Sequence, residues 1–535
     1  MYFASVNLSN ELNDDQEILY YNFNIFFQHL TECFIQPFLN NKTVFIQNLI
    51  TIHDLHKDKH GKLLLDIATF QSTNEKAKPI CNYLTTRFLI GTKLHAVVKR
   101  EKEKTYQVEN EFIDEKSREI LNEIAINERD FIIQQILNGL CSQSDLKSLM
   151  IVNDIYDYDE ILYNAKNKQK VVYPYNPTPD FYKYCQKFDV EMIGISRREL
   201  MTHINKEQFR NLVHKVDPKF DYKHHRLQST DSLEKIQKIL HETETYKLTS
   251  LKLNNNKQQQ TLMFIQEEMS AGGVGSYMVT KKDNIYEIND ELKFHSLDEI
   301  ATFFKEKNVD IIVAPYYEYK HKQPPNPSIG IILTDTGVSA YIVGNQRLDA
   351  NGAYFGIDIS PECFTPDIKT YFDENYQRLL AMAIRLAQHE QQMGRRGYGS
   401  IDAFMYVDNK HELRVGISEE NARFTGVCPT LMTAFGHEKM REFILKHQQF
   451  PCMLSNDDVI IRSQSTSLST TDVAKLFGKH DIPLFTKDNL EGVLILSCPM
   501  KKDDYYLVAL AIIALTIEKR KEIEIKINNV TKSKF

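Results

Sequence analysis

Three oxygen-bearing side chains in the last third of the chain have the types and spacing of a magnesium site. Asp402 lies in the short strand pattern Gly399–Phe404, and Glu419 and Asn421 end a second strand pattern, Leu413–Asn421, after a short turn. Two adjacent strands would bring the three side chains together. Mg²⁺ is a hard cation that accepts such oxygen ligands when phosphates complete its shell. We therefore predict Asp402, Glu419 and Asn421 as metal ligands.

The residues around this set sharpen the prediction. Arg423 follows Asn421 by two positions, so it shares a strand face with it and could bind a phosphoryl oxygen. Glu420 is a second acid beside Glu419, and strand alternation favours Glu419 because it shares a face with Asn421. Asp402 alone would equally suit an exposed strand end. The ordered set favours a metal and phosphate site.

A glycine-rich loop precedes this set. Gly272, Gly273 and Gly275 lie between two strand patterns, whereas the P-loop and the Rossmann turn join a strand to a helix. A glycine-rich turn can fold over a triphosphate and donate backbone N–H groups to it. An ordinary hairpin is the alternative interpretation.

Two further segments could contact a nucleotide. Lys206 begins a predicted helix, where a lysine is either solvent-exposed or directed at a phosphate. The segment Val313–Glu318 follows a buried strand, and its backbone could hydrogen-bond a nucleotide base. A proline-ended strand with surface tyrosines explains Val313–Glu318 equally well.

The elements that would position these residues alternate between strands and helices. Residues 1–165 show this alternation, which predicts an open, mostly parallel sheet. A helix is predicted over 117–137, and a long amphipathic helix over 370–393. The apolar run 507–515 is predicted as a buried helix, and the charged tail from 518 as loosely held.

Length and composition limit the class of protein. A chain of 535 residues predicts two to four domains. The net charge of −7 argues against non-specific nucleic-acid binding. The eight cysteines include no CxxC pair, which indicates a reducing compartment. No signal peptide and no run long enough to cross a bilayer is recognised, so we expect a cytoplasmic protein with neither membrane nor nucleic-acid partners.

The order of these motifs resembles that of the ATP-grasp carboxylate–amine ligases, most closely the branch of the pheganomycin-type peptide ligases. The resemblance covers about Val171–Ala434. It implies an α/β fold in three parts. These are a Rossmann-like pre-ATP-grasp domain (1–196), an ATP-grasp domain (197–436) and a small C-terminal α/β extension (437–535).

The resemblance also implies roles for single residues. Lys206 and Arg423 would be catalytic, and Asp402, Glu419 and Asn421 would hold the metal. The nucleotide-binding residues implied are Lys206, Gln266, Gly272, Gly273, Gly275, Ala314, Tyr316 and Glu318. Gln346, with Gly352–Gly356, resembles a Gln…Gly-x-Tyr-x-Gly stretch of the branch.

Gln266 departs from the family pattern, because the family usually has a second ATP-binding lysine at this place. A neutral glutamine cannot supply a lysine's charge. Either Lys247 or Lys252 could substitute, or ATP binding is weakened.

The resemblance implies an ATP-dependent ligase that joins a carboxylate to an amine, from amino acids or peptides, through an acyl phosphate. It would use ATP and Mg²⁺, with Mn²⁺ able to replace Mg²⁺, and a small carboxylate plus an amine as substrates; a homodimer is left open. The alternative, motivated by Gln266 and by the Lys- and Asn-rich insertions, is a degenerate ATP-grasp module that binds nucleotide or protein without ligase activity. A ligase that modifies a protein is a third interpretation.

Overall fold

The computed structural model of the chain describes most of the sequence from residue 205 onward and separate pieces before it. The described residues are 2–7, 21–34, 43–46, 55–57, 63–65, 96–98, 113–124, 126–152, 158–167, 169, 171–174, 179–194, 205–250, 259–268, 275–289, 291–319, 324–348, 354–463, 467–502 and 504–531.

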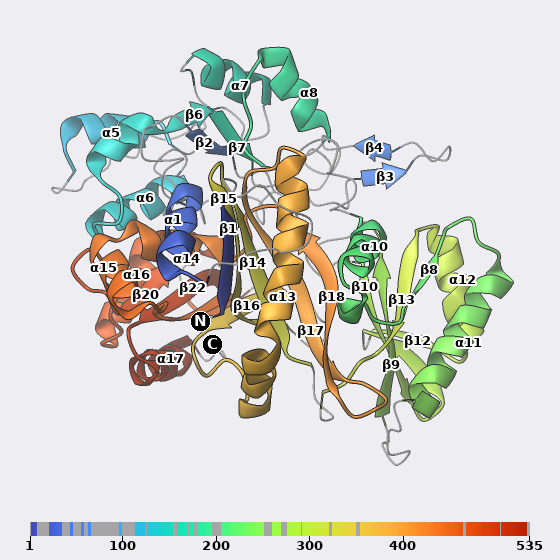
Figure 1. Ribbon diagram of the computed structural model, residues 1–535. Coiled ribbons are helices and arrows are strands. Elements are labelled where there is room, and N and C mark those ends of the chain that lie inside the picture. The colour runs from blue at the N-terminus through green and yellow to red at the C-terminus, as the bar shows by residue number, and fades with distance from the viewer. Residues whose placement is uncertain are drawn as a thin grey trace.

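A ten-stranded sheet forms the centre of the molecule (Figure 1). Its strands run in the order β18-β17-β14-β15-β16-β19-β22-β20, with β1 beside β15 and β21 beside β22. All of its named pairings are antiparallel. The bounds are β1 (Phe3–Asn7), β14 (Asn326–Leu333), β15 (Gly337–Leu348), β16 (Tyr354–Ile359), β17 (Gly397–Val407), β18 (Leu413–Asn421), β19 (Cys452–Ile461), β20 (Gly492–Ile495), β21 (Met500–Lys501) and β22 (Tyr506–Ala514).

Helices cover both faces of this large sheet because successive side chains of a strand point to opposite faces. On β14, Ile331 packs in a cluster with residues of α13, and the next residue, Ile332, packs in a cluster with residues of α1. The helix bounds are α1 (Phe23–Phe34), α10 (Lys206–Val216), α13 (Pro366–Gln392), α14 (Cys428–Gly436), α15 (Glu438–His447), α16 (Thr470–Lys479) and α17 (Ile517–Thr531).

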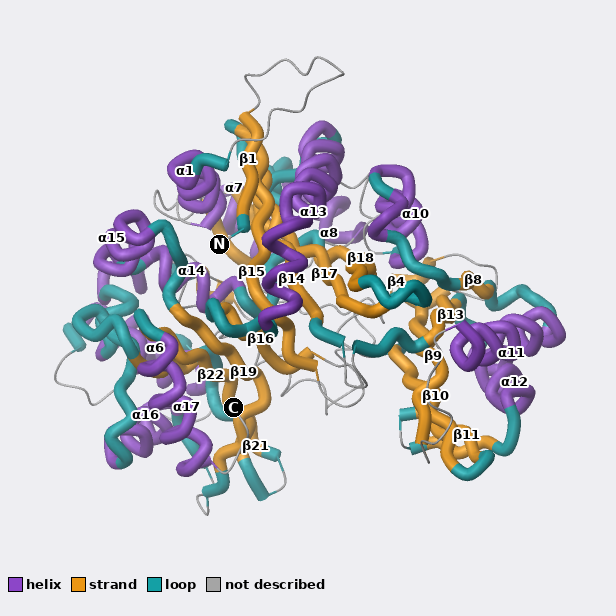
Figure 2. The backbone as a smooth tube through the Cα atoms, turned by 60° about the horizontal axis from the view of Figure 1, so that its bottom comes forward, coloured by secondary structure: helices purple, strands orange, loops and turns teal. Residues whose placement is uncertain are grey.

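A six-stranded antiparallel sheet forms a smaller lobe beside the large sheet. Its order is β12-β11-β10-β9-β13-β8. The two helices α11 and α12 pack together on its outer side (Figures 1 and 2). The bounds are β8 (His225–Leu227), α11 (Leu233–Ser250), β9 (Gln259–Glu267), β10 (Ser276–Lys282), β11 (Ile285–Ile288), β12 (Leu292–Phe294), α12 (Leu297–Lys307) and β13 (Ile311–Pro315).

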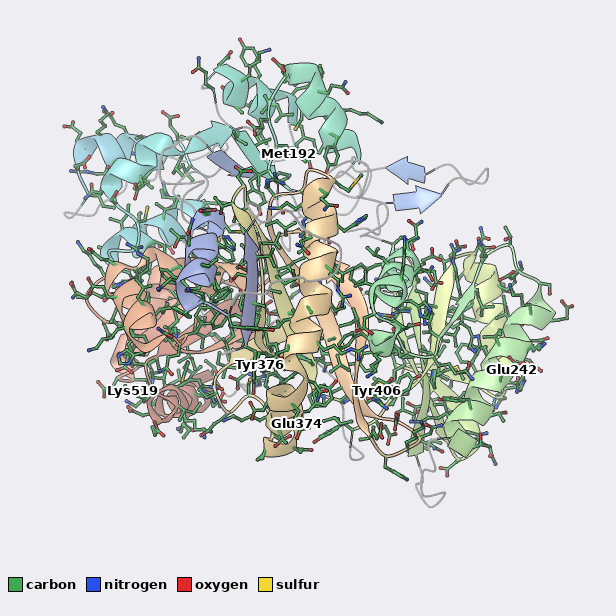
Figure 3. The ribbon with its side chains drawn as sticks, in the orientation of Figure 1. Met192, Glu242, Glu374, Tyr376, Tyr406 and Lys519 are labelled. Atoms are coloured by element: carbon green, nitrogen blue, oxygen red, sulfur yellow. The ribbon has the colours of Figure 1, made fainter. Side chains whose placement is uncertain are left out.

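The two lobes are easily located by their labelled surface residues. Figure 3 shows Glu242 on α11 at the outer side of the small lobe and Lys519 on α17 at the opposite side of the molecule. Tyr406 of β17 packs in a small aromatic cluster with Tyr317, which follows β13, so this cluster joins the lobes.

The N-terminal pieces include two parallel strand pairs, β2 with β7 and β5 with β6. The short strands β3 and β4 pair antiparallel. The bounds are β2 (Thr43–Ile46), β3 (Leu55–Lys57), β4 (Leu63–Leu65), β5 (Ala96–Val98), α5 (Glu115–Asn122), α6 (Ile126–Leu137), the 3-10 helix Gln143–Ser148, β6 (Met150–Val152), α7 (Tyr158–Asn167), β7 (Val171–Pro174) and α8 (Pro179–Phe188). A second 3-10 helix, Pro218–Phe220, follows α10.

The prediction of a mixed α/β fold is confirmed, while three local predictions need correction. The helix predicted over 117–137 is two helices, α5 and α6. The run 507–515 was predicted as a helix, which is wrong. It forms β22, which lies between β19 and β20 and is buried on both faces, and a continuous apolar run suits such a strand as well as a helix. The tail after 518 begins as α17, which buries Ile523 and Ile527.

Among the helices of the described residues, none is both long enough and apolar enough to cross a membrane.

Candidate active site

A cavity of about 330 Å³ lies between the two sheets and contains most of the side chains predicted from the sequence. The small lobe contributes residues of β9, β10 and β13, and the large sheet contributes residues of β14, β15, β17 and β18. The lining residues used below are Lys206, Arg210, Phe264, Gln266, Ser276, Met278, Ile312, Ala314, Tyr316, Gln346, Asp402, Glu419, Asn421, Arg423 and Asp457.

The register of β17 and β18 brings the three predicted metal ligands together. Asp402 is paired with Glu419 and Ser400 with Asn421, and a bulge follows Asp402. The Nδ2 of Asn421 donates to one Asp402 carboxylate oxygen at 2.8 Å. The Nε2 of Gln346 on β15 donates to the other at 2.8 Å. Asp402 is therefore held in place by two amides from two strands.

The electrostatics of this group suit a cation. The pKa of the Asp402 carboxyl is raised to about 7, first by burial and then by the negative charge of Glu419. Hydrogen bonds from Gln346 and Asn421 and the charge of Arg423 act in the opposite direction. Two carboxylates that repel each other across a partly buried site are stabilised by a cation between them.

The donor set of this cavity has two carboxylates and one amide. Among the described residues, no three His, Cys, Asp or Glu side chains gather as a metal cluster. Carboxylate and amide oxygens are hard ligands that suit Mg²⁺, and phosphates usually provide part of its shell. The residues present therefore fit a magnesium ion that shares its coordination with a phosphate.

The adjacent acids Glu419 and Glu420 face opposite sides of β18. Glu419 lines the cavity, and its Oε2 lies 3.0 Å from the Nζ of Lys206. Glu420 is 7% exposed, and its Oε1 accepts a hydrogen bond from the buried Arg395 at 2.5 Å. The alternation used in the sequence analysis thus describes how the strand presents them.

The two predicted cations lie on either side of Glu419 and Asn421. Lys206 is the first residue of α10, whose N-cap Asn205 accepts a hydrogen bond from the backbone N–H of Gln208 at 2.9 Å. The Nη1 of Arg423 donates to the Oδ1 of Asn421 at 2.5 Å. Both cations line the cavity.

The linker after β13 forms another wall of the cavity. Ala314 and Tyr316 line it, whereas Glu318 does not. The Nζ of Lys247, fully buried on α11, donates to the Tyr316 carbonyl at 2.5 Å and lies 3.5 Å from the Oε1 of Glu318. Lys247 therefore braces this linker from behind instead of entering the cavity. Lys252 lies outside the described residues.

The glycine loop is described only at its end. Gly272 and Gly273 lie outside the described residues. Gly275 has φ +75°, and its carbonyl accepts the backbone N–H of Glu267 at 2.8 Å, which closes the β9–β10 hairpin. The next residue, Ser276, lines the cavity.

Gln266 lines the cavity from the middle of the small lobe, since β9 pairs with both β10 and β13. Its Oε1 accepts a hydrogen bond from the Nη2 of Arg210 at 2.8 Å. The sequence analysis did not single out Arg210. A spacing of four residues from Lys206 places both cations on one face of α10, which is the signal that could have found it.

Asp457 is a second lining residue that was not predicted. It lies in an irregular stretch of β19 between Asn456 and Val459, so the C-terminal part of the chain also reaches the cavity. Nothing in the local sequence pattern places this bulge beside β16.

Comparisons with known proteins give matches among solved structures. The chain is similar to an N5-carboxyaminoimidazole ribonucleotide synthetase solved with ADP, at 10% identity and a TM-score of 0.47, over 84% of this chain and 95% of that one. It is similar to N5-carboxyaminoimidazole synthetase from Staphylococcus aureus complexed with ADP, at 9% identity and a TM-score of 0.45, over 91% and 97%. The enzyme from Thermus thermophilus gives 9% identity and a TM-score of 0.42, over 73% and 90%. No family model and no curated protein sequence matches the chain.

Proposed function

We propose that this protein is an ATP-dependent carboxylate–amine ligase of the ATP-grasp type, acting on an amino acid or peptide through an acyl phosphate. One observation carries the proposal. A single cavity between two antiparallel sheets holds two carboxylates and an amide at one wall, cations beside them, and a backbone linker at another wall. The closer relation to the pheganomycin-type branch is part of this proposal and rests on the motifs in the sequence.

The two walls of the cavity suit the two ends of a nucleotide. Phe264, Met278, Ile312 and Ala314 give the small lobe an apolar wall of the kind that holds a base. Lys206 and Arg423 provide positive charge at the acidic end, where phosphates would lie. A nucleotide would therefore span from the linker to β17 and β18.

Asp402, Glu419 and Asn421 would hold the metal ion. Mg²⁺, or Mn²⁺ in its place, would neutralise charge on the phosphoryl group that is transferred. Gln346 and Asn421 orient the Asp402 carboxylate through the hydrogen bonds described above. Lys206, held 3.0 Å from Glu419, keeps a fixed positive charge beside the ligand.

The proposed reaction has two steps. An oxygen of the substrate carboxylate attacks the γ-phosphorus of ATP, and the bond to ADP breaks. The amine nitrogen then attacks the acyl carbon, inorganic phosphate leaves, and the nitrogen loses a proton. Lys206 and Arg423 would stabilise the negative charge that develops on the phosphoryl oxygens in both steps.

The first test is Mg²⁺-dependent ADP release in the presence of mixed amino acids, with Glu419→Gln as the key variant. We expect its turnover to fall by roughly a hundredfold or more, because the ligand loses a charge where phosphoryl transfer needs it. Glu412→Gln is the matched control, since it removes an exposed carboxylate from the same β17–β18 hairpin. Circular dichroism would check that both variants fold.

Equal turnover of Glu419→Gln and the wild type would reject the metal assignment. Nucleotide binding without ADP release for any acid and amine would instead favour the non-ligase alternative. Mass spectrometry of products from enzyme, ATP and an amino-acid mixture would identify the two substrates.

A further inference from the structure

Arg210 is a buried cation inside the cavity that the proposed mechanism has not used. It lies on α10 one turn after Lys206, is 2% exposed and lines the cavity. Its Nε donates to the Ser418 carbonyl at 3.1 Å and its Nη2 to the Oε1 of Gln266 at 2.8 Å. Its guanidinium carbon lies 4.9 Å from the centre of the Tyr222 ring. The side chain is therefore fixed from three sides.

One nitrogen of this guanidinium has no partner. Within the described part of the chain, the buried Nη1 of Arg210 makes no hydrogen bond, and every hydrogen-bond acceptor of Arg210 is neutral. A buried charge that lacks an opposite charge is costly, and so is a buried donor that lacks an acceptor. An anionic oxygen in the cavity would satisfy both requirements.

Gln266 explains how Arg210 is kept available for such an anion. A carboxylate at position 266 would pair with the guanidinium and cancel its charge, whereas an ammonium group there would repel it. The neutral amide oxygen accepts one hydrogen bond and leaves the charge intact. Lys247 does not supply this charge, because its ammonium group binds the Tyr316 carbonyl behind the linker.

We infer that Arg210 binds the phosphates of the nucleotide, that it supplies the charge expected from a lysine at position 266, and that Gln266 is its positioning residue. This inference rests on the proposed function, because it needs a nucleotide in the cavity. A substrate carboxylate is the other oxyanion that could reach Arg210. The phosphates are favoured because Gln266 lies on β9, directly between β10 and the linker strand β13.

The decisive variant is Gln266→Glu, tested by calorimetric titration with Mg²⁺-ATP and with adenosine. Glutamate should pair with Arg210, so the melting temperature should stay the same or rise. The Kd for Mg²⁺-ATP should nevertheless increase by roughly tenfold to a hundredfold, since a charge-assisted hydrogen bond is lost. The Kd for adenosine, which has no phosphate, should change by less than about twofold.

Arg210→Met should give the same affinity pattern, with some loss of stability. Arg396→Met is the matched control, since it removes an arginine that pairs with the exposed Asp335 outside the cavity. The double variant Arg210→Met/Gln266→Lys moves the charge across the pair and should recover most of the affinity for Mg²⁺-ATP. If Arg210→Met fails to fold, Gln266→Glu carries the test alone.

Unchanged affinity of Gln266→Glu for Mg²⁺-ATP would overturn the inference, as would an equal loss for ATP and adenosine. A loss of affinity for the acid substrate alone would assign Arg210 to the carboxylate instead and would also overturn it. A wild-type protein that binds no Mg²⁺-ATP would reject the proposed function together with this inference. Normal wild-type binding with unaffected variants would reject the inference alone.

Discussion

Glu419 and Glu420 are neighbours in the sequence but lie in two different environments. Glu419 faces the cavity beside Lys206, and Glu420 faces the core beside Arg395. Arg395 is fully buried and also contacts the fully buried Glu390 of α13. This buried group joins the end of α13 to β18, so it supports the strand from the side opposite to the active site.

We predict that Arg395→Met lowers the free energy of unfolding by about 3–5 kcal/mol, because two buried carboxylates lose their cation. Arg396→Met, the adjacent residue with a surface partner, should change it by less than about 1 kcal/mol. Urea unfolding of the two variants would measure the difference. Similar losses for both would mean that the buried group adds no more than a surface ion pair.

At this scale, the sequence was most informative where residues lie on neighbouring strands. The proximity of Asp402, Glu419 and Asn421 follows from a hairpin and its alternation, which short-range patterns encode. The pairing of Arg210 with Gln266 joins a helix to a distant strand, so it depends on tertiary packing that no local pattern reports.

At the scale of elements, β7 is fastened to β17 by one tyrosine. The hydroxyl of Tyr173 accepts the backbone N–H of Tyr398 at 3.0 Å, and its ring stacks on Phe424 with 4.5 Å between centroids. Gly397, with φ +103°, leaves room for this hydroxyl: a Cβ there would lie 2.0 Å from it. The N-terminal part of the chain therefore contacts the sheet that carries Asp402.

Gly397→Ala should destabilise the protein for two reasons, the strained backbone and the collision with Tyr173. Gly394→Ala is the matched control, since it has φ +93° and nothing within 4 Å of its Cβ position. We expect about 1 kcal/mol for the control, from backbone strain alone, and at least twice that for Gly397→Ala. Thermal or urea unfolding would separate them, and equal losses would show that Tyr173 yields without penalty.

The sequence pattern identified most elements but not all of their types. The amphipathic spacing of 370–393 correctly predicted α13, because a helix half-exposed to water has a clear period. The run that forms β22 has no period, since both of its faces are buried, and its type was therefore predicted wrongly.

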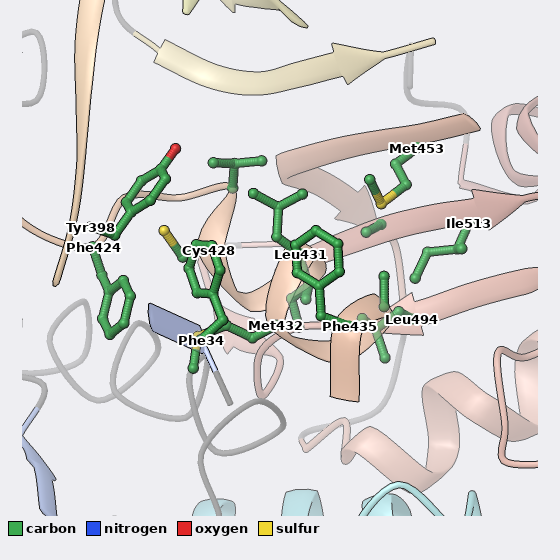
Figure 4. Packing of buried hydrophobic residues seen from close by; sticks show 14 of the residues in the cluster. Phe34, Tyr398, Phe424, Cys428, Leu431, Met432, Phe435, Met453, Leu494 and Ile513 are labelled. Carbon is green, nitrogen blue, oxygen red and sulfur yellow. The ribbon is translucent and has the colours of Figure 1, made fainter. Parts of the chain in front are cut away.

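At the scale of the whole molecule, the C-terminal strands are part of the same sheet as the site. The strand β19 pairs with β16, and β22 pairs with β19. Met453, Leu494 and Ile513 of these strands pack in one cluster with Phe34 of α1 and Leu431 of α14 (Figure 4). Asp457 of β19 also lines the cavity.

We therefore predict that a chain ending at residue 436 does not fold. It would expose the edge of β16 and one side of the large apolar cluster, both of which promote aggregation. Soluble expression with a cooperative melting transition would contradict this prediction. A chain ending at residue 531 is the control and should melt like the full-length protein, because α17 ends there.

The long-range pairing of β1 has a consequence for how the protein is made. Ser5 on β1 bonds Ser339 on β15, 334 positions later, and the register continues from Phe3 with Tyr341 to Asn7 with Gly337. A ribosome needs on the order of tens of seconds to synthesise the intervening chain. During that time the first strand has no partner, and β22 completes the sheet only when nearly all of the chain has been made. Newly synthesised protein must therefore keep its first strand from pairing with other chains until late in translation.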